Sequence, residues 1–325
     1  METITKNSSS THPRNISVNT TASDQATNGD LSSVLERLDS IILGNPLANK
    51  LALVCMLAQG HLLIEDIPGV GKTTLSHTLA TLLGLSFKRV QFTSDLLPSD
   101  VIGVTIYDVE AKRFTFKKGP IFTPFLLADE INRATPKTQS ALLQAMEEYE
   151  VSVEGQTFTL TKPFFVVATQ NPTEQHGTFP LPESQLDRFL IRLSLGYPGE
   201  KFEKQLLSGA LDKLSVSSIL TPEALLSHTR SVQKVHVSPS IIDYLWGILE
   251  LTRRSDYFVS GLSPRAGLQW LRAAKALAYL EGRDMVLPDD IKLLAPYVAA
   301  HRLVANSGKD TRELIATLVN HQSAP

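Results

Sequence analysis

Hydrophobic residues in the first two thirds of the chain form short apolar runs separated by helix-like segments. From Leu31 to Ile42 the apolar residues recur at helical spacing, and Gly44 and Pro46 end that pattern. Short apolar runs then follow at 61–66, 87–92, 124–128, 164–168 and 189–195. Runs that are apolar throughout and alternate with helices predict buried strands of a mostly parallel sheet that is covered by helices on both faces.

Two segments interrupt this alternation with the period-two pattern of a β-hairpin, at about 101–118 and 151–160. After Tyr197–Gly199 the strand patterns stop, and helical patterns run through 241–254, 264–280 and 289–303. We therefore predict three parts, which are a disordered polar tail over 1–30, an α/β core over 31–198 and an all-helical domain over 199–325.

Composition and charge are those of an ordinary globular protein. Hydrophobic residues make up 42% of the 325 residues, charged residues make up 20%, and the formal net charge is -2. This balance provides no global positive field for nucleic acid or for an anionic membrane. No apolar stretch reaches the roughly 20 residues of a transmembrane helix, and the N-terminus lacks the apolar core of a signal peptide. We therefore expect a cytoplasmic protein without a transmembrane segment.

A glycine-rich turn joins the first apolar run to the following helix. Glycines let backbone N–H groups curl around phosphate oxygens, and the helix N-terminus adds partial positive charge. A lysine at this place reaches the β- and γ-phosphates, and a threonine hydroxyl binds Mg²⁺. The turn therefore predicts an ATP site, although a plain glycine-rich turn is the alternative for the segment taken alone. The predicted nucleotide-binding residues are Pro68, Gly69, Val70, Gly71, Lys72, Thr73 and Thr74.

Asp66 stands where the usual phosphate-loop pattern has its first glycine. A carboxylate directed at the phosphates would repel them, so we expect the Asp66 side chain to point away from the nucleotide.

Polar residues end two of the later apolar runs. Asp129 and Glu130 follow Phe125–Ala128, and ligands of open α/β sheets bind at the carboxyl ends of strands. We expect the Thr73 hydroxyl to bind Mg²⁺ directly, Asp129 to complete the Mg²⁺ shell through water, and Glu130 to polarise the attacking water. Asn171 ends the next run, where its amide is placed to bond the γ-phosphate or that water; a turn residue is the alternative.

Two arginines are candidates for sensing the γ-phosphate. Arg188 precedes the last apolar run, so its guanidinium could reach the nucleotide of a neighbouring subunit, or pair locally with Asp187 or Glu183. Arg265 projects from the first turn of a helix that Ser263 caps. There it could bridge the two domains across the nucleotide, or remain solvated.

These motifs occur in the order seen in AAA+ ATPases. The stretches Glu65–Thr73, Leu127–Glu148 and Ala168–Pro172 closely resemble the MoxR family, and the resemblance covers about 31–304. It implies a five-stranded, mostly parallel P-loop core with two β-hairpin inserts and a C-terminal helical lid. The phosphate loop is then the Walker A motif, and the acidic pair is the Walker B motif.

The resemblance also implies a partnership and an activity. Members of the family are thought to form hexameric rings, with the ATP site between subunits, and to assemble or activate partner complexes as chaperone-like machines. A von Willebrand A domain protein is then a plausible partner, and Arg133 is placed near the subunit interface.

Two other functions remain open at this point. One is a nucleotide-gated assembly scaffold with little turnover. The other is a motor on nucleic acid, because Lys112–Lys118 mixes basic and aromatic residues. Isolated histidines lack metal-ligand spacing, so no structural metal is expected. The single cysteine, Cys55, lies in an apolar helical run, where a buried structural role is expected.

Overall fold

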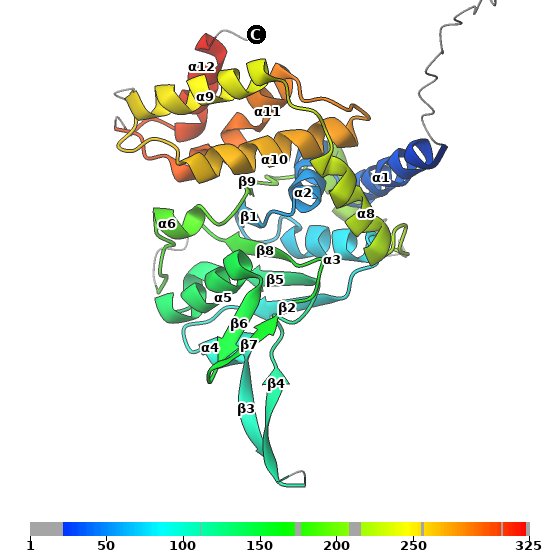
Figure 1. The fold of residues 1–325 in the computed structure, drawn as a ribbon, viewed down its shortest axis with the longest axis vertical. Helices are drawn as coiled ribbons and strands as arrows, with labels where there is room; N and C mark the ends of the chain where they lie inside the picture. The colour runs from blue at the N-terminus through cyan, green and yellow to red at the C-terminus, as the bar shows by residue number, and fades with distance from the viewer. Residues whose placement is uncertain are drawn as a thin grey trace, which may run out of the picture.

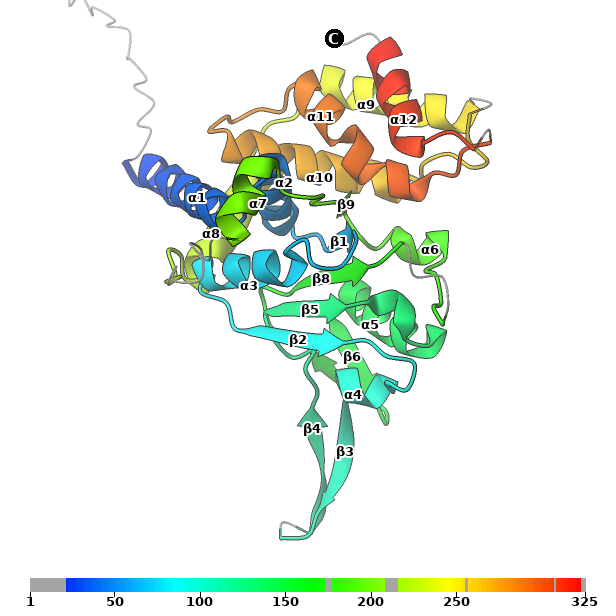
Figure 2. The same ribbon diagram turned by 180° about the vertical axis from the view of Figure 1, so that it is seen from behind.

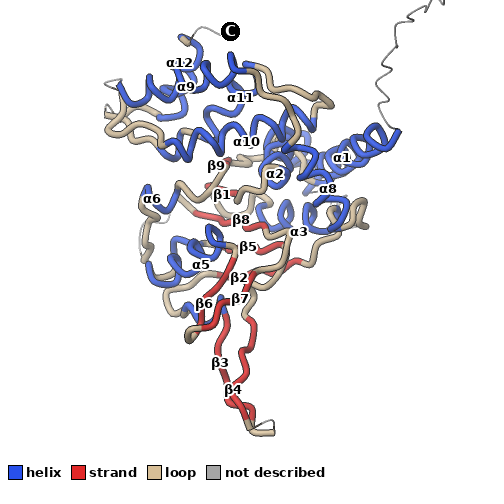
Figure 3. The backbone as a smooth tube through the Cα atoms, in the orientation of Figure 1, coloured by secondary structure: helices blue, strands red, loops and turns tan. Residues whose placement is uncertain are grey.

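The structure is a computed structural model that describes residues 22–110, 112–172, 177–207, 216–254, 257–306 and 308–322. Figure 1 shows a sheet with flanking helices, a layer of C-terminal helices above it, and a two-stranded hairpin that projects from the opposite end. Figure 3 separates these parts by secondary structure.

A five-stranded sheet in the order β2-β5-β8-β1-β9 forms the centre, and its neighbouring strands pair in parallel. Its strands are β1 (Leu62–Glu65), β2 (Phe87–Gln91), β5 (Phe125–Asp129), β8 (Phe165–Gln170) and β9 (Ile191–Leu193). Side chains of one strand point alternately to the two faces, and both faces are buried. Leu62 and Ile64 of β1 join one hydrophobic cluster, whereas Leu63 joins the other.

Helices of the first part cover the two faces and connect the strands (Figures 1 and 2). α2 begins after Asn45, whose side chain caps it by accepting a hydrogen bond from the Ala48 N–H (3.0 Å), with Pro46 at the first helical position. The helices are α1 (Ala22–Ile41), α2 (Pro46–Leu57), α3 (Lys72–Leu82), α4 (Pro98–Ile102), η1 (Ile131–Arg133), α5 (Pro136–Glu148) and α6 (Glu183–Leu186).

Two antiparallel hairpins stand outside the central sheet. β3 (Gly103–Asp108) pairs with β4 (Arg113–Lys118), and β6 (Glu150–Val153) pairs with β7 (Gln156–Thr159). Phe116 of the first hairpin stacks on Phe158 of the second, with ring centroids 4.2 Å apart. The far end of β3–β4 projects away from the body of the protein (Figure 1).

Beyond β9, the described elements are helical apart from two isolated bridges. Trp270 of α10 is fully buried and donates its indole N–H to the Ile291 carbonyl of α11 (3.2 Å), which fixes the centre of this layer. The elements are α7 (Glu200–Leu207), α8 (Pro222–Gln233), α9 (Pro239–Arg254), α10 (Pro264–Leu280), α11 (Pro288–Val298), η2 (Ala300–Arg302) and α12 (Thr311–His321).

The predicted fold class is confirmed, including the parallel sheet, the two hairpins and the C-terminal helical part. The predicted tail over 1–30 was too long, because α1 already begins at Ala22. The apolar residues from Leu31 onward anchor this helix, and adding polar turns to a helix that already exists needs no new nucleation. Residues 1–21 of the predicted tail lie outside the described residues. None of the described helices combines the length and the apolar composition that crossing a membrane requires.

His61 leads to a prediction about stability. Its ring lies just before β1, where Nδ1 accepts a hydrogen bond from the Val166 N–H and Nε2 donates to the Met146 carbonyl, both at 3.1 Å. The ring is therefore neutral, and burial lowers its pKa from 6.5 to about 4. Between these values the unfolded chain binds a proton that the folded chain does not, so stability falls as the pH falls.

We expect the free energy of unfolding of the parent protein to lose roughly 3 kcal/mol more than that of His61→Asn across this pH interval. Urea titrations at several pH values would measure it. Burial also lowers the pKa values of His228 and His301. The parent and His61→Asn both contain these two histidines, so their contribution cancels in the comparison. Identical pH dependence in the parent and His61→Asn would contradict the prediction.

Candidate active site

The loop between β1 and α3 has the backbone that a phosphate site needs. Gly69 (φ 87°) and Gly71 (φ 94°) adopt the left-handed region that favours glycine. A Cβ atom built at either glycine would meet no other atom within 4 Å, so the space beside the loop is open. Gly71 precedes α3, and no side chain caps this helix, which leaves its first N–H groups available to an anion.

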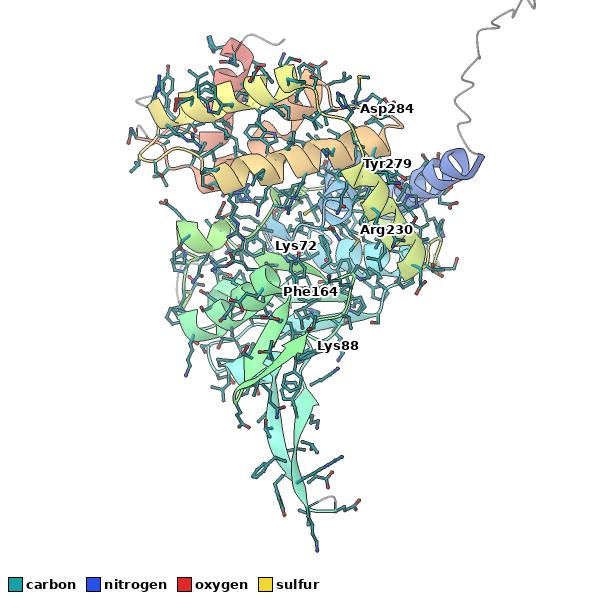
Figure 4. All side chains as sticks on the ribbon, in the orientation of Figure 1. Lys72, Lys88, Phe164, Arg230, Tyr279 and Asp284 are labelled. Atoms are coloured by element: carbon teal, nitrogen blue, oxygen red, sulfur yellow. The ribbon has the colours of Figure 1, made fainter. Side chains whose placement is uncertain are left out.

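Lys72 lies over this loop and donates from Nζ to the carbonyl oxygens of Asp66 (2.7 Å) and Ile67 (2.9 Å). Figure 4 shows it between the sheet and the C-terminal helices, whereas Lys88 of the edge strand β2 lies nearer the projecting hairpin. Burial lowers the pKa of Lys72, and the Asp66, Asp129 and Glu130 carboxylates oppose this shift. The Lys72 ammonium group and the Asp129–Glu130 pair therefore interact electrostatically across the loop.

Asp66 connects the loop to the chain that leaves β9. Its Oδ2 atom accepts hydrogen bonds from the N–H groups of Leu195 (2.7 Å) and Gly196 (2.8 Å), and from the Ser194 hydroxyl (2.9 Å). Its Oδ1 atom accepts from the Ile67 N–H (2.9 Å). All four partners are donors, so this position requires a side chain whose two oxygens both accept. The Asp66 carboxylate thereby ties the phosphate loop to the chain that follows β9.

The two acids lie at the carboxyl end of β5. Asp129 accepts hydrogen bonds from the Thr169 hydroxyl at Oδ1 (2.5 Å) and from the Arg89 guanidinium at Oδ2 (2.6 Å). The Glu130 N–H donates to the same Thr169 hydroxyl (2.8 Å). A single β8 hydroxyl therefore orients both acidic residues, and β2 supplies a countercharge.

Glu130 has a left-handed backbone (φ 55°) and starts the short helix η1. Its Oε2 atom accepts hydrogen bonds from the Gln91 amide (2.8 Å) and from Arg133 (2.9 Å). Arg133, for which the family resemblance implies a place near a subunit interface, pairs with Glu130 while its side chain stays 47% exposed.

Asn171 directly follows β8 and is buried. β8 lies between β5 and β1, with Ala168 opposite Ala128 and Gln170 opposite Glu65. This register brings Asn171 to the edge of the sheet where the acidic pair ends β5 and the phosphate loop leaves β1. Lys72, Asp129, Glu130 and Asn171 are thereby gathered at one edge, from separate parts of the chain.

The oxygen donors at this edge fit Mg²⁺. A magnesium ion in a phosphate site usually takes one or two protein oxygens, with phosphate and water completing the octahedron. The Thr73 hydroxyl at the start of α3 and the Asp129 carboxylate are oxygen donors of this kind. Among the described residues, no group of three His, Cys, Asp or Glu side chains is placed to hold a metal ion.

Arg188 and Arg265 lie elsewhere, at the amino edge of the sheet. Arg188 pairs through Nε with Glu147 (2.9 Å), and Arg265 pairs with the same carboxylate (2.5 Å). Met146, which directly precedes Glu147, accepts a hydrogen bond from His61, and His61 precedes β1. The phosphate loop follows the other end of β1, so the two arginines and the loop lie at opposite edges.

This placement corrects one expectation. Arg265 does not bridge the two parts of the chain across the nucleotide held by its own loop. The C-terminal layer is instead fixed over the amino edge, because Arg302 of η2 binds Asp187 (2.8 Å) and the carbonyl of Phe189 (2.7 Å) just before β9. Arg188 does not approach its own loop either, and its expected role toward a neighbouring subunit stays a prediction.

Sequence reasoning missed three residues of this site. Arg89 and Gln91 belong to β2, whose polar side chains suggest only an exposed edge. Thr169 interrupts the apolar run of β8, and that hydroxyl at the end of a buried strand is a signal that could have been read.

Two family models match the chain. The model described as the ATPase family associated with various cellular activities (AAA) matches residues 61–191, and the AAA lid domain model matches 250–318. A solved structure of a candidate ATPase from Cytophaga hutchinsonii is similar with a TM-score of 0.85 at 35% sequence identity. It covers 93% of this chain and 97% of that chain.

Curated relatives are similar over most of their length. The uncharacterised Bacillus subtilis protein YeaC is 46% identical over 279 residues, which is 84% of this chain and 87% of that protein. Chaperone MoxR1 of Mycobacterium tuberculosis is 39% identical over 284 residues, 84% of this chain and 75% of that protein. Protein MoxR of Paracoccus denitrificans is 30% identical over 312 residues, 87% of this chain and 91% of that protein. With this site, this sheet and these relatives, the chain belongs to the MoxR family of AAA+ ATPases.

Proposed function

We propose that this chain binds ATP with Mg²⁺ at the carboxyl edge of its sheet and hydrolyses it to ADP and phosphate. The observation that carries the proposal is the meeting of a positive-φ glycine loop, Lys72 and the Asp129–Glu130 pair at that edge. Backbone N–H groups of the loop and of α3 bind the phosphates, and Lys72 exchanges its carbonyl partners for phosphate oxygens.

The protein residues divide the chemical work. Thr73 and Asp129 hold Mg²⁺, which neutralises charge on the β- and γ-phosphates when it is bound. Glu130 orients and polarises the water that attacks the γ-phosphorus, and Asn171 bonds that water or the γ-phosphate. To do so, Glu130 turns from the Gln91 amide toward the water.

The arginines support a subunit ring. Arg188 and Arg265 are at the edge opposite the chain's own phosphate loop, so a γ-phosphate that they contact belongs to another subunit. A closed ring of identical subunits places one such edge against the next subunit's loop, and a hexamer is the size that the family resemblance implies.

For the cellular role, we propose that the cytoplasmic ring uses ATP turnover to assemble or activate a partner protein complex. Relatives named as chaperone and MoxR proteins support this role. A von Willebrand A domain protein is the proposed client. Affinity capture with Glu130→Gln as bait in ATP and magnesium, followed by mass spectrometry, tests this client. We expect a von Willebrand A domain protein to co-purify only when nucleotide is present. Its absence would argue against this client.

A nucleic-acid motor is the second candidate, because the β3–β4 hairpin exposes Phe114 (73%) and Tyr107 (53%) beside Lys112 and Arg113. The two exposed rings contact each other, with their centroids 5.2 Å apart. The chain as a whole has a formal net charge of -2, which provides no positive field for nucleic acid. We expect labelled single-stranded DNA to show no salt-dependent binding in fluorescence anisotropy. Binding that weakens steeply with salt and is lost in Lys112→Ala/Arg113→Ala would favour the motor.

Two substitutions test the hydrolytic site. Glu130→Gln should lower kcat about 100-fold or more while ATP binding persists, because the amide cannot polarise water. Lys72→Ala should weaken ATP binding itself. Phosphate release and fluorescent-nucleotide binding measure the two effects, and Lys88→Ala, at an exposed lysine of β2, is the matched control for the lysine change. Turnover of Glu130→Gln equal to that of the parent would refute hydrolysis at this site and leave the low-turnover scaffold.

Asp66→Asn tests the connection between the loop and β9. An amide turns one of two acceptor oxygens into a donor that faces N–H groups, which leaves buried donors without a partner. We expect ATP affinity to fall about 10-fold and the thermal midpoint to drop, since such a loss costs roughly 1–3 kcal/mol. The exposed Asp95→Asn serves as control, and unchanged affinity in Asp66→Asn would show that the loop keeps its shape without these bonds.

A further inference from the structure

The carboxylate of Glu147 lies where the α/β core meets the helical lid, near the end of α5. Its Oε2 atom accepts from Arg188 Nε (2.9 Å), which belongs to the core. Its Oε1 atom accepts from Arg265 Nη1 (2.5 Å), which belongs to lid helix α10. Each oxygen of one carboxylate therefore holds one of the two arginines, across the boundary between the two parts.

A second acidic residue ties the same pair to the lid. Asp187 lies 3.9 Å from Arg265 Nε and accepts a hydrogen bond from Arg302 Nε at 2.8 Å. The Arg302 side chain is almost fully buried, with 3% exposed, and it also donates to the carbonyl of Phe189 (2.7 Å). The segment that carries Arg188 and the lid that carries Arg265 are thus held together by one alternating row of charges.

Both arginines keep the capacity to bind an anion while they are paired. Arg188 uses Nε for Glu147 and Nη1 for the Ser184 carbonyl (3.1 Å). Among the described residues, the Nη2 group of Arg188 and that of Arg265 make no hydrogen bond. A guanidinium has five N–H donors, so each of these arginines has donors left for a phosphate oxygen.

A hollow of about 210 Å³ opens beside the two arginines. Its lining includes Glu147, Arg188 and Arg265 together with Gln59, Tyr149 and Arg272. Three arginine charges face one glutamate charge in this lining, because His61, which also lines it, is neutral. Asp187 beside Arg265 adds a second negative charge, which its other partner, Arg302, offsets, so the surroundings favour an anion even with Glu147 ionised. The hydrogen bond from Arg265 lowers the pKa of Glu147 and keeps it ionised at neutral pH.

We propose that Glu147 is a positioning residue that holds Arg188 of the core and Arg265 of the lid together as one anion-binding pair for the triphosphate of a neighbouring subunit. The inference rests on the proposed ATPase function and adds a requirement to it. Because one arginine of the pair comes from the lid, the pair exists only in the lid orientation in which Arg265 reaches Glu147. The lid then controls hydrolysis at the next subunit's site, not at its own.

Glu147→Gln tests the proposal, with Glu148→Gln as the matched control, since the Glu148 carboxylate is bonded by Gln144 of the same helix. A glutamine amide replaces one of the two acceptor oxygens with an NH₂ donor that would face a guanidinium, so in this geometry it can hold only one of the two arginines. We expect kcat to fall about 10-fold or more, because arginines that contact a transferring phosphate contribute roughly 10³ to 10⁵ in rate. KM for ATP should change less than about twofold, because the phosphate loop lies at the other edge. Glu148→Gln should match the parent.

Mixed rings separate positioning from a general structural defect. A ring of Glu147→Gln and Glu130→Gln subunits contains sites with an intact Glu130 that face an intact Glu147–Arg188–Arg265 group. We expect the mixture to hydrolyse ATP faster than the sum of the two variants alone, as should a mixture of Arg188→Ala with Glu130→Gln. A misfolded Glu147→Gln subunit would bring no usable site to the ring and would give no recovery.

The outcomes distinguish the inference from the function beneath it. Parent-like or increased kcat in Glu147→Gln, while Arg188→Ala is slow, would overturn the inference and leave the ATPase function intact. Recovery in the Arg188→Ala mixture without recovery in the Glu147→Gln mixture would overturn it as well. If neither Arg188→Ala nor Glu130→Gln lowers turnover, the proposed function itself fails and the inference fails with it.

Discussion

The parallel order of β5, β8 and β1 is the constraint on which the rest of the structure depends. Parallel neighbours end at the same edge of a sheet, so the residues that follow these three strands must meet there. The acidic pair, Asn171 and the phosphate loop come from distant parts of the chain, and the pairing of their strands brings them together. Burial of the sheet on both faces by the two hydrophobic clusters holds that order.

Electrostatics then determines what this edge can accept. Two carboxylates and one ammonium group lie around a loop whose backbone N–H groups are open to an anion. A triphosphate with a divalent cation would match that mixture, because the phosphates would meet Lys72 and the loop while the cation would meet Asp129. These side chains also bond to one another and to the loop: Lys72 donates to loop carbonyls, Arg89 pairs with Asp129, and the Gln91 amide donates to Glu130.

The sequence predicted the parts of the fold and site that contiguous segments determine. The apolar runs predicted the strands, and the phosphate loop, the acidic pair and Asn171 each stand at the end of one of those runs. Arg89 and Gln91 could not be assigned in this way, because their role depends on β2 lying next to β5, and sheet order is not a local property. The orientation of the lid depends on a tertiary contact too, the binding of Arg302 to the segment before β9, so Arg265 was expected at the wrong edge.

The central claim is that the carboxyl edge of the sheet binds a triphosphate and its metal, and a crystal structure with a non-hydrolysable ATP analogue and Mn²⁺ tests it most directly. The account predicts one anomalous manganese peak between the Thr73 hydroxyl and the Asp129 carboxylate, with the terminal phosphate in contact with Lys72. An analogue bound away from the β1–α3 loop, or a metal held without either of these residues, would contradict it.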